Sequence, residues 1–205
     1  MAINDYATNT EIKAAMPDGN WSIDYDALFT TLATRASRLF DQVAGKKPGS
    51  FYVSTDVTRY FDGNGEILLP ISDLAAAPTS LAVAETGSIT VYTTWASTDY
   101  ILLPYNAPDN GKPYTELLID GMNGSKAVWY PFPKSVKIVG KFGYAAAIPD
   151  LVKQAVVMQA SKWFKRGQQA FQDTGAITEL GRLLYTKRID PEVEMIALGF
   201  RGSPH

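Results

Sequence analysis

Three oxygen-bearing side chains alternate with glycines in one short stretch, VTRYFDGNGEILLP, at residues 57–70. Asp62, Asn64 and Glu66 are residue types that open a calcium loop, in which carboxylate and amide oxygens coordinate the ion. Such a loop also needs glycine at its sixth position and glutamate at its twelfth, where this chain has isoleucine and aspartate. Asn64-Gly65 is instead a common turn dipeptide, because both residues tolerate positive φ. We therefore expect a hairpin turn here and no metal site.

Residues that commonly catalyse reactions are scarce in the chain. It has no cysteine, and its single histidine is the last residue, His205. Disulfides, zinc–thiolate sites and cysteine nucleophiles are thereby excluded, and the usual general base is missing from any ordered site. The carboxylate pairs Asp24/Asp26 and Glu192/Glu194 lie near predicted helix starts, where negative charge is favourable anyway. A hydrolase that uses only carboxylates stays open as a third hypothesis.

The totals indicate a soluble globular protein with a real core. The 205 residues suggest one large domain or two small ones, and 46% are hydrophobic. With 19 basic and 21 acidic residues, the net charge of −2 does not imply tight non-specific binding to nucleic acid. The start has no signal-peptide pattern, and no apolar run is long enough to span a membrane, so we expect the chain to stay in the cytosol or in an assembly built there.

Helical patterns occupy both ends of the chain. Thr8 and Glu11 form a predicted capping box before a short helix over 9–16. Asp24 is the expected cap of a second helix, which carries one apolar stripe and ends at Gly45. After the middle of the chain, proline at a first turn starts a central helix over 149–166. Further helices are expected over 177–187 and from Asp190 to about Leu198, followed by an extended tail.

The middle of the chain reads as short strands separated by turn residues. We expect strands near residues 52–61, 66–70, 80–84, 89–94, 100–103, 115–119 and 135–142. Such a series is typical of a small antiparallel sandwich or barrel. The predicted class is therefore α+β: a helical bundle formed by the N- and C-terminal helices, with a central antiparallel β-sandwich or barrel-like insertion.

The predicted organisation has four segments. Residues 1–48 are N-terminal helices of the bundle, and 49–146 are the β-rich insertion. Residues 147–189 are the C-terminal helices of the bundle, and 190–205 are a short helix with a tail.

Basic residues gather near the ends of the later helices: Lys162, Lys165, Arg166, Lys187 and Arg188. Cations at helix C-termini complement the helix dipole, so one interpretation is simply solvated helix ends. The other is a contact between subunits, or a mildly basic lining near passing DNA, because the first thirty residues are predominantly acidic.

Aromatic residues are frequent in the β-rich part, and they include Trp95 and Trp129. Packing within a sandwich explains them, since aromatic pairs stabilise neighbouring strands. Aromatic side chains are also enriched at contact surfaces. We therefore keep a glycan-binding hypothesis that uses these two tryptophans.

Several motifs together resemble the head–tail adaptor proteins, also called head completion or connector proteins, of long-tailed bacteriophages. The matching stretches follow one another along most of the chain: Tyr6-x-x-x-x-Glu11-Ile12-Lys13, Leu32-x-x-x-Ala36-Ser37-Arg38, Thr58-Arg59-Tyr60-Phe61-Asp62-Gly63, Thr98-Asp99-Tyr100, Val136-x-Ile138-x-Gly140-x-Phe142-Gly143-Tyr144 before Pro149-Asp150-Leu151, and Ile189-Asp190-Pro191-Glu192-Val193 with Phe200-Arg201. The run from Val136 into the central helix carries the resemblance most strongly.

The resemblance implies a structural virion protein without catalysis, cofactor or metal. Family members form a ring below the portal, usually with twelve-fold symmetry, that extends the DNA channel and offers a surface to the stopper or tail. The implied partners are the portal protein, the stopper or tail protein, further copies of the chain and, transiently, packaged DNA, with no membrane. The implied location is the virion head–tail interface, after assembly in the host cytoplasm.

The resemblance also implies that the C-terminal segment reaches the portal, with Ile196, Leu198, Phe200 and Arg201 as its anchors. The alternative function is a glycan- or host-surface-binding module of a phage tail.

Overall fold

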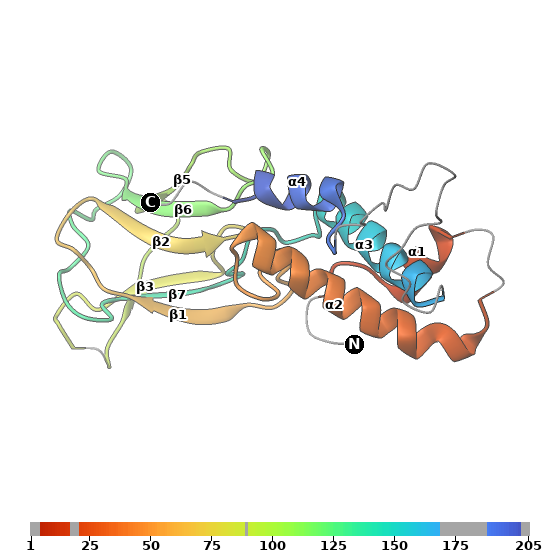
Figure 1. Cartoon of the computed structure of the whole chain (residues 1–205). Helices are drawn as coiled ribbons and strands as arrows, with labels where there is room; N and C mark the ends of the chain where they lie inside the picture. Colours follow the sequence, from red (N-terminus) through yellow and green to blue (C-terminus); the bar gives the residue numbers. More distant parts are fainter. Residues whose placement is uncertain (1–4, 17–20, 89, 169–187, 202–205) are drawn as a thin grey trace. The chain divides into compact units, whose positions relative to one another are not determined.

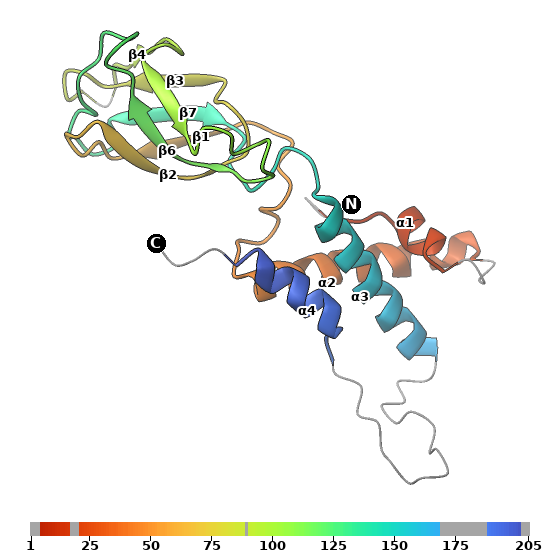
Figure 2. The same cartoon turned by 90° about the horizontal axis from the view of Figure 1, so that it is seen from above.

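The computed structural model describes residues 5–16, 21–88, 90–168 and 188–201, and it confirms the α+β class. The chain divides into two compact units, Met1–Phe51 with Ile148–His205, and Tyr52–Ala147. The first, the helical unit, carries the helices, and the second, the β unit, carries the strands (Figure 1, Figure 2). The predicted helix over 177–187 lies outside the described residues.

The helical unit has two long helices that run side by side. Its elements are α1 (Asn9–Ala14), the 3₁₀ turn η1 (Ile23–Tyr25), α2 (Asp26–Ala44), α3 (Asp150–Gln168) and α4 (Pro191–Gly199). α1 and α4 each contact both long helices, and the core includes Phe29, Phe40, Val156 and Phe164. No helix in the described part of the chain is long and apolar enough to cross a membrane.

Local sequence explains how these helices begin and end. The capping box is present, since the Thr8 hydroxyl accepts the Glu11 N–H at 3.2 Å and the Thr8 N–H donates to the Glu11 carboxylate at 2.8 Å. The prediction that Asp24 caps the second helix is wrong: Ser22 accepts the N–H of Asp24 at 3.2 Å and starts η1, which leads into α2. Gly45 adopts a φ of 67° and ends α2, as predicted.

The β unit consists of two antiparallel sheets. Its strands are β1 (Val57–Phe61), β2 (Leu68–Leu74), β3 (Ser80–Val83), β4 (Thr93–Thr94), β5 (Tyr100–Leu103), β6 (Tyr114–Ile119) and β7 (Val136–Gly140). One sheet has the order β1-β7-β3-β4 and the other β2-β6-β5. Buried residues from both sheets form one core, which includes Leu69, Leu117, Leu81, Ile138 and Trp129. The β unit is therefore a sandwich.

The predicted hairpin at Asn64-Gly65 is wrong, although the segment does reverse into a new strand. β1 pairs with β7, with Arg59 opposite Ile138, while β2 pairs with β6, with Leu69 opposite Leu117. The segment between β1 and β2 therefore passes from one sheet to the other. Alternation along a strand specifies which face is buried, but it does not specify the partner strand.

Three further boundaries differ from the sequence prediction. The strands expected over 52–61 and 89–94 are shorter, because β1 begins at Val57 and β4 comprises Thr93 and Thr94. The tail expected to be extended from Gly199 is instead helical through Gly199, and Phe200 keeps a right-handed helical backbone as the C-cap.

Candidate functional site

The predicted basic residues lie around the junction of α3 and α4. Lys162 forms a 3.5 Å ion pair with Asp190, so part of its charge is neutralised. Lys165, in the last turn of α3, and Arg188, just before α4, are exposed, whereas Arg166 is half-buried. Lys187 lies outside the described residues. Lys165, near the end of α3, and Arg188, before α4, are thus exposed cations for which the described residues provide no ion pair.

A buried glutamine fixes the start of α4. The Asp190 side chain accepts the N–H of Glu192 at 3.0 Å and caps the helix, as its sequence predicted. The Asp190 N–H in turn donates to the side-chain oxygen of Gln159 at 3.0 Å. Val193 and Ala197 are buried on the inner face of α4. The helix is therefore attached to the helical unit at its cap and along one side.

The four predicted docking residues do not share one environment. Ile196 is half-buried, and the ring of Phe200 packs edge-on against Phe51 with 5.3 Å between ring centroids. Leu198 is 45% exposed, and Arg201 is exposed beside Gly45. Phe200 thus holds the end of α4 to the helical unit, Ile196 is partly covered, and Leu198 and Arg201 face solvent. Met195, which no sequence motif singled out, is 68% exposed one turn before Leu198.

A buried polar network joins the first described residues to the end of α2. The Tyr6 hydroxyl donates to the Asp41 carboxylate at 2.5 Å and accepts the N–H of Phe51 at 3.2 Å. The other carboxylate oxygen of Asp41 accepts the Gly49 N–H at 2.9 Å and lies 3.3 Å from the guanidinium of Arg38. This network fixes the segment that leads out of the helical unit. The feature of the sequence that could have indicated this network is Asp41, an aspartate within the apolar stripe of the second helix.

The electrostatics of this network keep the phenol as a donor. Burial raises the pKa of the Tyr6 phenol, and the hydrogen bond to the Asp41 carboxylate raises it further. Burial also raises the pKa of the Asp41 carboxyl, although Tyr6, Gly49 and Arg38 all favour its charged form. The phenol therefore stays protonated over the ordinary pH range.

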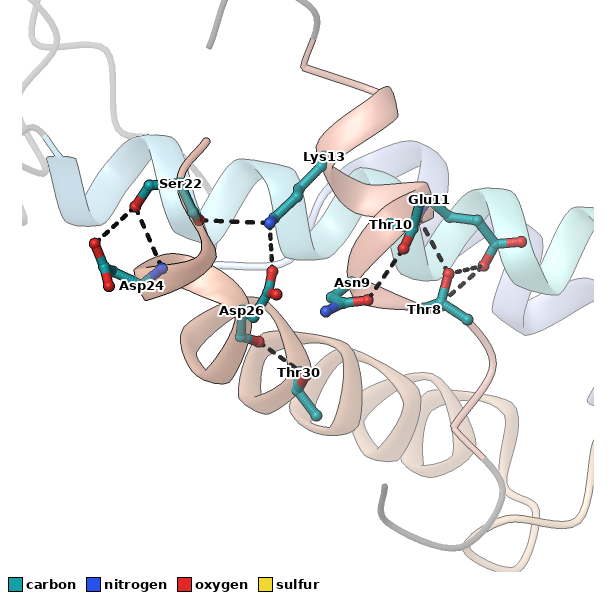
Figure 3. A network of polar contacts seen from close by, with 9 residues as sticks. All are labelled: Thr8, Asn9, Thr10, Glu11, Lys13, Ser22, Asp24, Asp26 and Thr30. Atoms are coloured by element: carbon teal, nitrogen blue, oxygen red, sulfur yellow. Dashed lines mark hydrogen bonds and ion pairs between the residues drawn. The ribbon is translucent and has the colours of Figure 1, made fainter. Parts of the chain in front are cut away.

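Helix α1 is tied to both long helices by charged groups, and Figure 3 shows its contacts to the start of α2. Lys13 forms an ion pair with Asp26 and donates to the Ser22 carbonyl at 3.5 Å, which joins α1 to the start of α2. Glu11 accepts from Lys153 of α3 at 2.9 Å. Burial alone would raise the pKa of Glu11, but the hydrogen bonds from Thr8 and Lys153 hold it below its ordinary value. The acidic residues of this region are thus largely engaged within the chain.

The segment that suggested calcium binding uses its oxygens for backbone contacts. Asp62 accepts the N–H of Lys134 at 2.7 Å, and Asn64 accepts the N–H of Glu66 at 3.1 Å. Gly63 comes so close to the chain at Tyr130 that an added Cβ would lie 1.9 Å from the Tyr130 carbonyl oxygen. Within the described ranges, no three His, Cys, Asp or Glu residues are grouped as metal ligands would be. These contacts hold the segment in place where it passes from one sheet to the other.

The two tryptophans of the glycan-binding hypothesis lie in the core of the β unit. Trp95 and Trp129 are both buried, and their rings stack with 4.9 Å between centroids. The indole N–H of Trp129 donates to the Ile67 carbonyl at 3.0 Å. Because neither ring has a free face, these residues cannot stack on a sugar, and the interpretation as sandwich packing is confirmed.

Comparisons with known proteins give matches among solved structures. No family model matches the chain, and no curated protein matches it. The chain is similar to a chain from the neck of an empty gene transfer agent particle, which was computed with six-fold symmetry. The two chains are 16% identical, with a TM-score of 0.53, and the match covers 96% of this chain and 90% of that chain. A chain from the virion of a native gene transfer agent particle is 18% identical, with a TM-score of 0.52 and coverage of 100% and 94%. Across both of its units, the chain thus has the fold of chains from gene transfer agent particles.

Proposed function

We propose that this chain is a non-enzymatic structural protein of a phage or phage-like particle, and that it serves as the adaptor between head and tail. The observation that carries the proposal is the fold shared with a neck chain over nearly the whole length of both proteins. The sequence motifs support the same assignment independently, because they lie in both units. In this role the chain extends the DNA channel below the portal and presents a surface to the stopper or tail.

The proposed assembly is a ring, with twelve copies as the resemblance implies. The neck of the related particle was computed with six-fold symmetry. Twelve copies in a ring satisfy six-fold symmetry as well. A closed ring also suits a chain with distinct surfaces on different sides, because head-to-tail contacts close when the rotation between copies divides the circle.

The segment 190–205 is the proposed portal-docking end. In this segment Leu198 and Arg201 are the residues offered to the portal, because both face solvent. Phe200 contributes indirectly by holding α4 in place, and half-buried Ile196 is proposed to do the same. Exposed Lys165 and Arg188, with Lys162, Arg166 and Lys187, are the proposed contacts to neighbouring subunits or to DNA in the channel.

Electron microscopy of a lysate from the parent phage with this gene deleted tests the adaptor function. The expected result is free tails beside tailless heads that leak or lose DNA. Complete particles that fail to attach to cells would contradict the proposal and favour a host-binding module. Complete and infectious particles would contradict both.

Point variants test the docking end better than a truncation. Removing residues 190–205 would also take Val193 and Ala197 out of the helical core, so lost binding could reflect unfolding. The double variant Leu198→Ser, Arg201→Glu should fold normally and lose binding to purified portal in a pull-down. Met122→Ser, at an almost fully exposed site in the β unit, is the matched control. Unchanged portal binding by the double variant would refute this assignment of the docking end.

A further inference from the structure

Large apolar side chains are exposed around the start of α2. Ile23 is 80% exposed, and Tyr25 and Leu28 are 41% and 44% exposed. Ile23 and Tyr25 belong to η1, and the Tyr25 ring packs edge-on against Phe164 of α3. Leu28 is therefore the exposed large apolar residue of α2 itself. Covering Leu28 with an apolar side chain of a partner would be favourable, because apolar surface would be removed from water.

Charged residues of opposite sign flank Leu28 along the chain. Arg35 follows Leu28 by seven residues, a spacing that returns to one face of α2, and Asp24 lies in η1, four residues before Leu28. Both side chains are exposed. Asp24 accepts from the Ser22 hydroxyl at 2.9 Å, and no ion pair of Arg35 is found among the described residues. This α2 ridge, defined by Asp24, Leu28 and Arg35, thus has the order acidic, apolar, basic.

The outer side of α4 carries the same order of chemistry. Glu192, Met195 and Leu198 are exposed at steps of three, and exposed Arg201 follows the helix end. The opposite side of the helix, with Val193 and Ala197, is buried in the helical unit. This α4 ridge, defined by Glu192, Met195, Leu198 and Arg201, is therefore available to another molecule.

Two ridges with the same charge order are complementary when they run antiparallel. Glu192 then meets Arg35, Arg201 meets Asp24, and Leu198 with Met195 covers Leu28. At a rise of about 1.5 Å per residue, Leu28 and Arg35 are about 10 Å apart along the axis, and Leu198 and Glu192 about 9 Å. The two ridges therefore match both in the signs of their charges and in the distance between their charged and apolar groups.

We propose that the α4 ridge of one copy packs antiparallel on the α2 ridge of a second copy of this chain. The contact joins two different surfaces, which is the type of contact that builds a ring. The inference rests on the proposed adaptor function and adds the residues that join neighbouring subunits. Leu198 and Arg201 also belong to the proposed portal-docking end, so the test uses Arg35 and Glu192, which do not.

Charge reversal at Arg35 and Glu192 tests the contact. The full-length chain is titrated onto heads purified from the deletion lysate, and electron microscopy with quantitative gels measures loading. Arg35→Glu alone and Glu192→Arg alone should each raise the concentration for half-maximal loading at least about tenfold, because each places like charges opposite one another. The chain carrying both changes should load like wild type. Glu194→Arg, in the same helix turn but outside the ridge, should also load normally.

An equal mixture of the two single variants separates contacts between copies from contacts within one copy. In the mixture, each interface between the two variants pairs opposite charges, so loading should recover. If loading recovers with the double variant but not with the mixture, the proposal is refuted, because Arg35 and Glu192 would then interact within one copy. Wild-type loading by both single variants would refute it and leave the adaptor function standing. If wild type itself does not load onto the heads, the adaptor function and this contact are both refuted.

Discussion

The hydroxyl of Tyr6 donates a 2.5 Å hydrogen bond to Asp41, thirty-five positions later, and also accepts the N–H of Phe51. One phenol oxygen thereby joins the N-terminal segment, the end of α2 and the last residue of the helical unit before the β unit. All three residues are buried.

Replacing Tyr6 by phenylalanine should therefore destabilise the helical unit. The change leaves the ring volume but removes a donor from a buried carboxylate and an acceptor from a buried N–H. Such a loss costs about 2–3 kcal/mol, to be measured by urea unfolding followed by circular dichroism. Tyr25→Phe, at an exposed phenol with no hydrogen bond found among the described residues, should change the free energy of unfolding little. Equal stability of both variants would mean that the Tyr6 network adds no net stability.

The contact of Glu11 with Thr8 and Lys153 should make stability depend on acid pH. Its pKa is below the ordinary value of 4.5 in the folded state, so its contribution is present above pH 4.5 and is lost as pH falls through the folded value. Glu11→Gln should be less stable than wild type at pH 7 by at most about 1 kcal/mol, because the group is partly exposed. The difference should shrink below pH 4.5. A difference that stays constant from pH 7 to pH 3 would contradict this.

The close approach of Gly63 to Tyr130 should not tolerate a side chain. A Cβ would overlap the Tyr130 carbonyl oxygen and lie 2.7 Å from the Ser135 hydroxyl. Gly63→Ala should therefore destabilise the β unit by about 3 kcal/mol or more. The measurement is the midpoint temperature of thermal unfolding, followed by the fluorescence of the buried tryptophans, and it should be lower than in wild type. Gly121→Ala, where no atom lies within 4 Å of the added Cβ, is the matched control. Equal midpoint temperatures for the two variants would show that the segment between β1 and β2 can move to make room for a side chain.

Local patterns predicted the helices well because each depends on neighbouring residues. The apolar spacing indicated α2 and α3, and the Thr8 and Asp190 caps marked where α1 and α4 begin. The α+β class followed from where helical and strand patterns change along the chain.

Relationships between distant residues could not be read from the sequence in the same way. The partner of β1 is β7, far along the chain, so a turn dipeptide suggested a hairpin that does not form. The bond between Tyr6 and Asp41 links positions that share no local pattern. The exposure of Met195 and the burial of Phe200 depend on how α4 packs, which the apolar content of that short helix does not determine.

Phe200 should act on docking through the stability of α4, whereas Arg201 should act directly. The ring of Phe200 packs against Phe40 and Phe51, with centroid distances of 6.0 and 5.3 Å. Phe200→Ala should therefore lower the free energy of unfolding by about 1–3 kcal/mol, measured by urea denaturation, and weaken portal binding in the same preparation. Arg201→Ala should leave unfolding unchanged, because the side chain is exposed, yet should weaken portal binding. If Phe200→Ala unfolds like wild type while losing portal binding, the phenylalanine is itself a contact to the portal and not a support for α4.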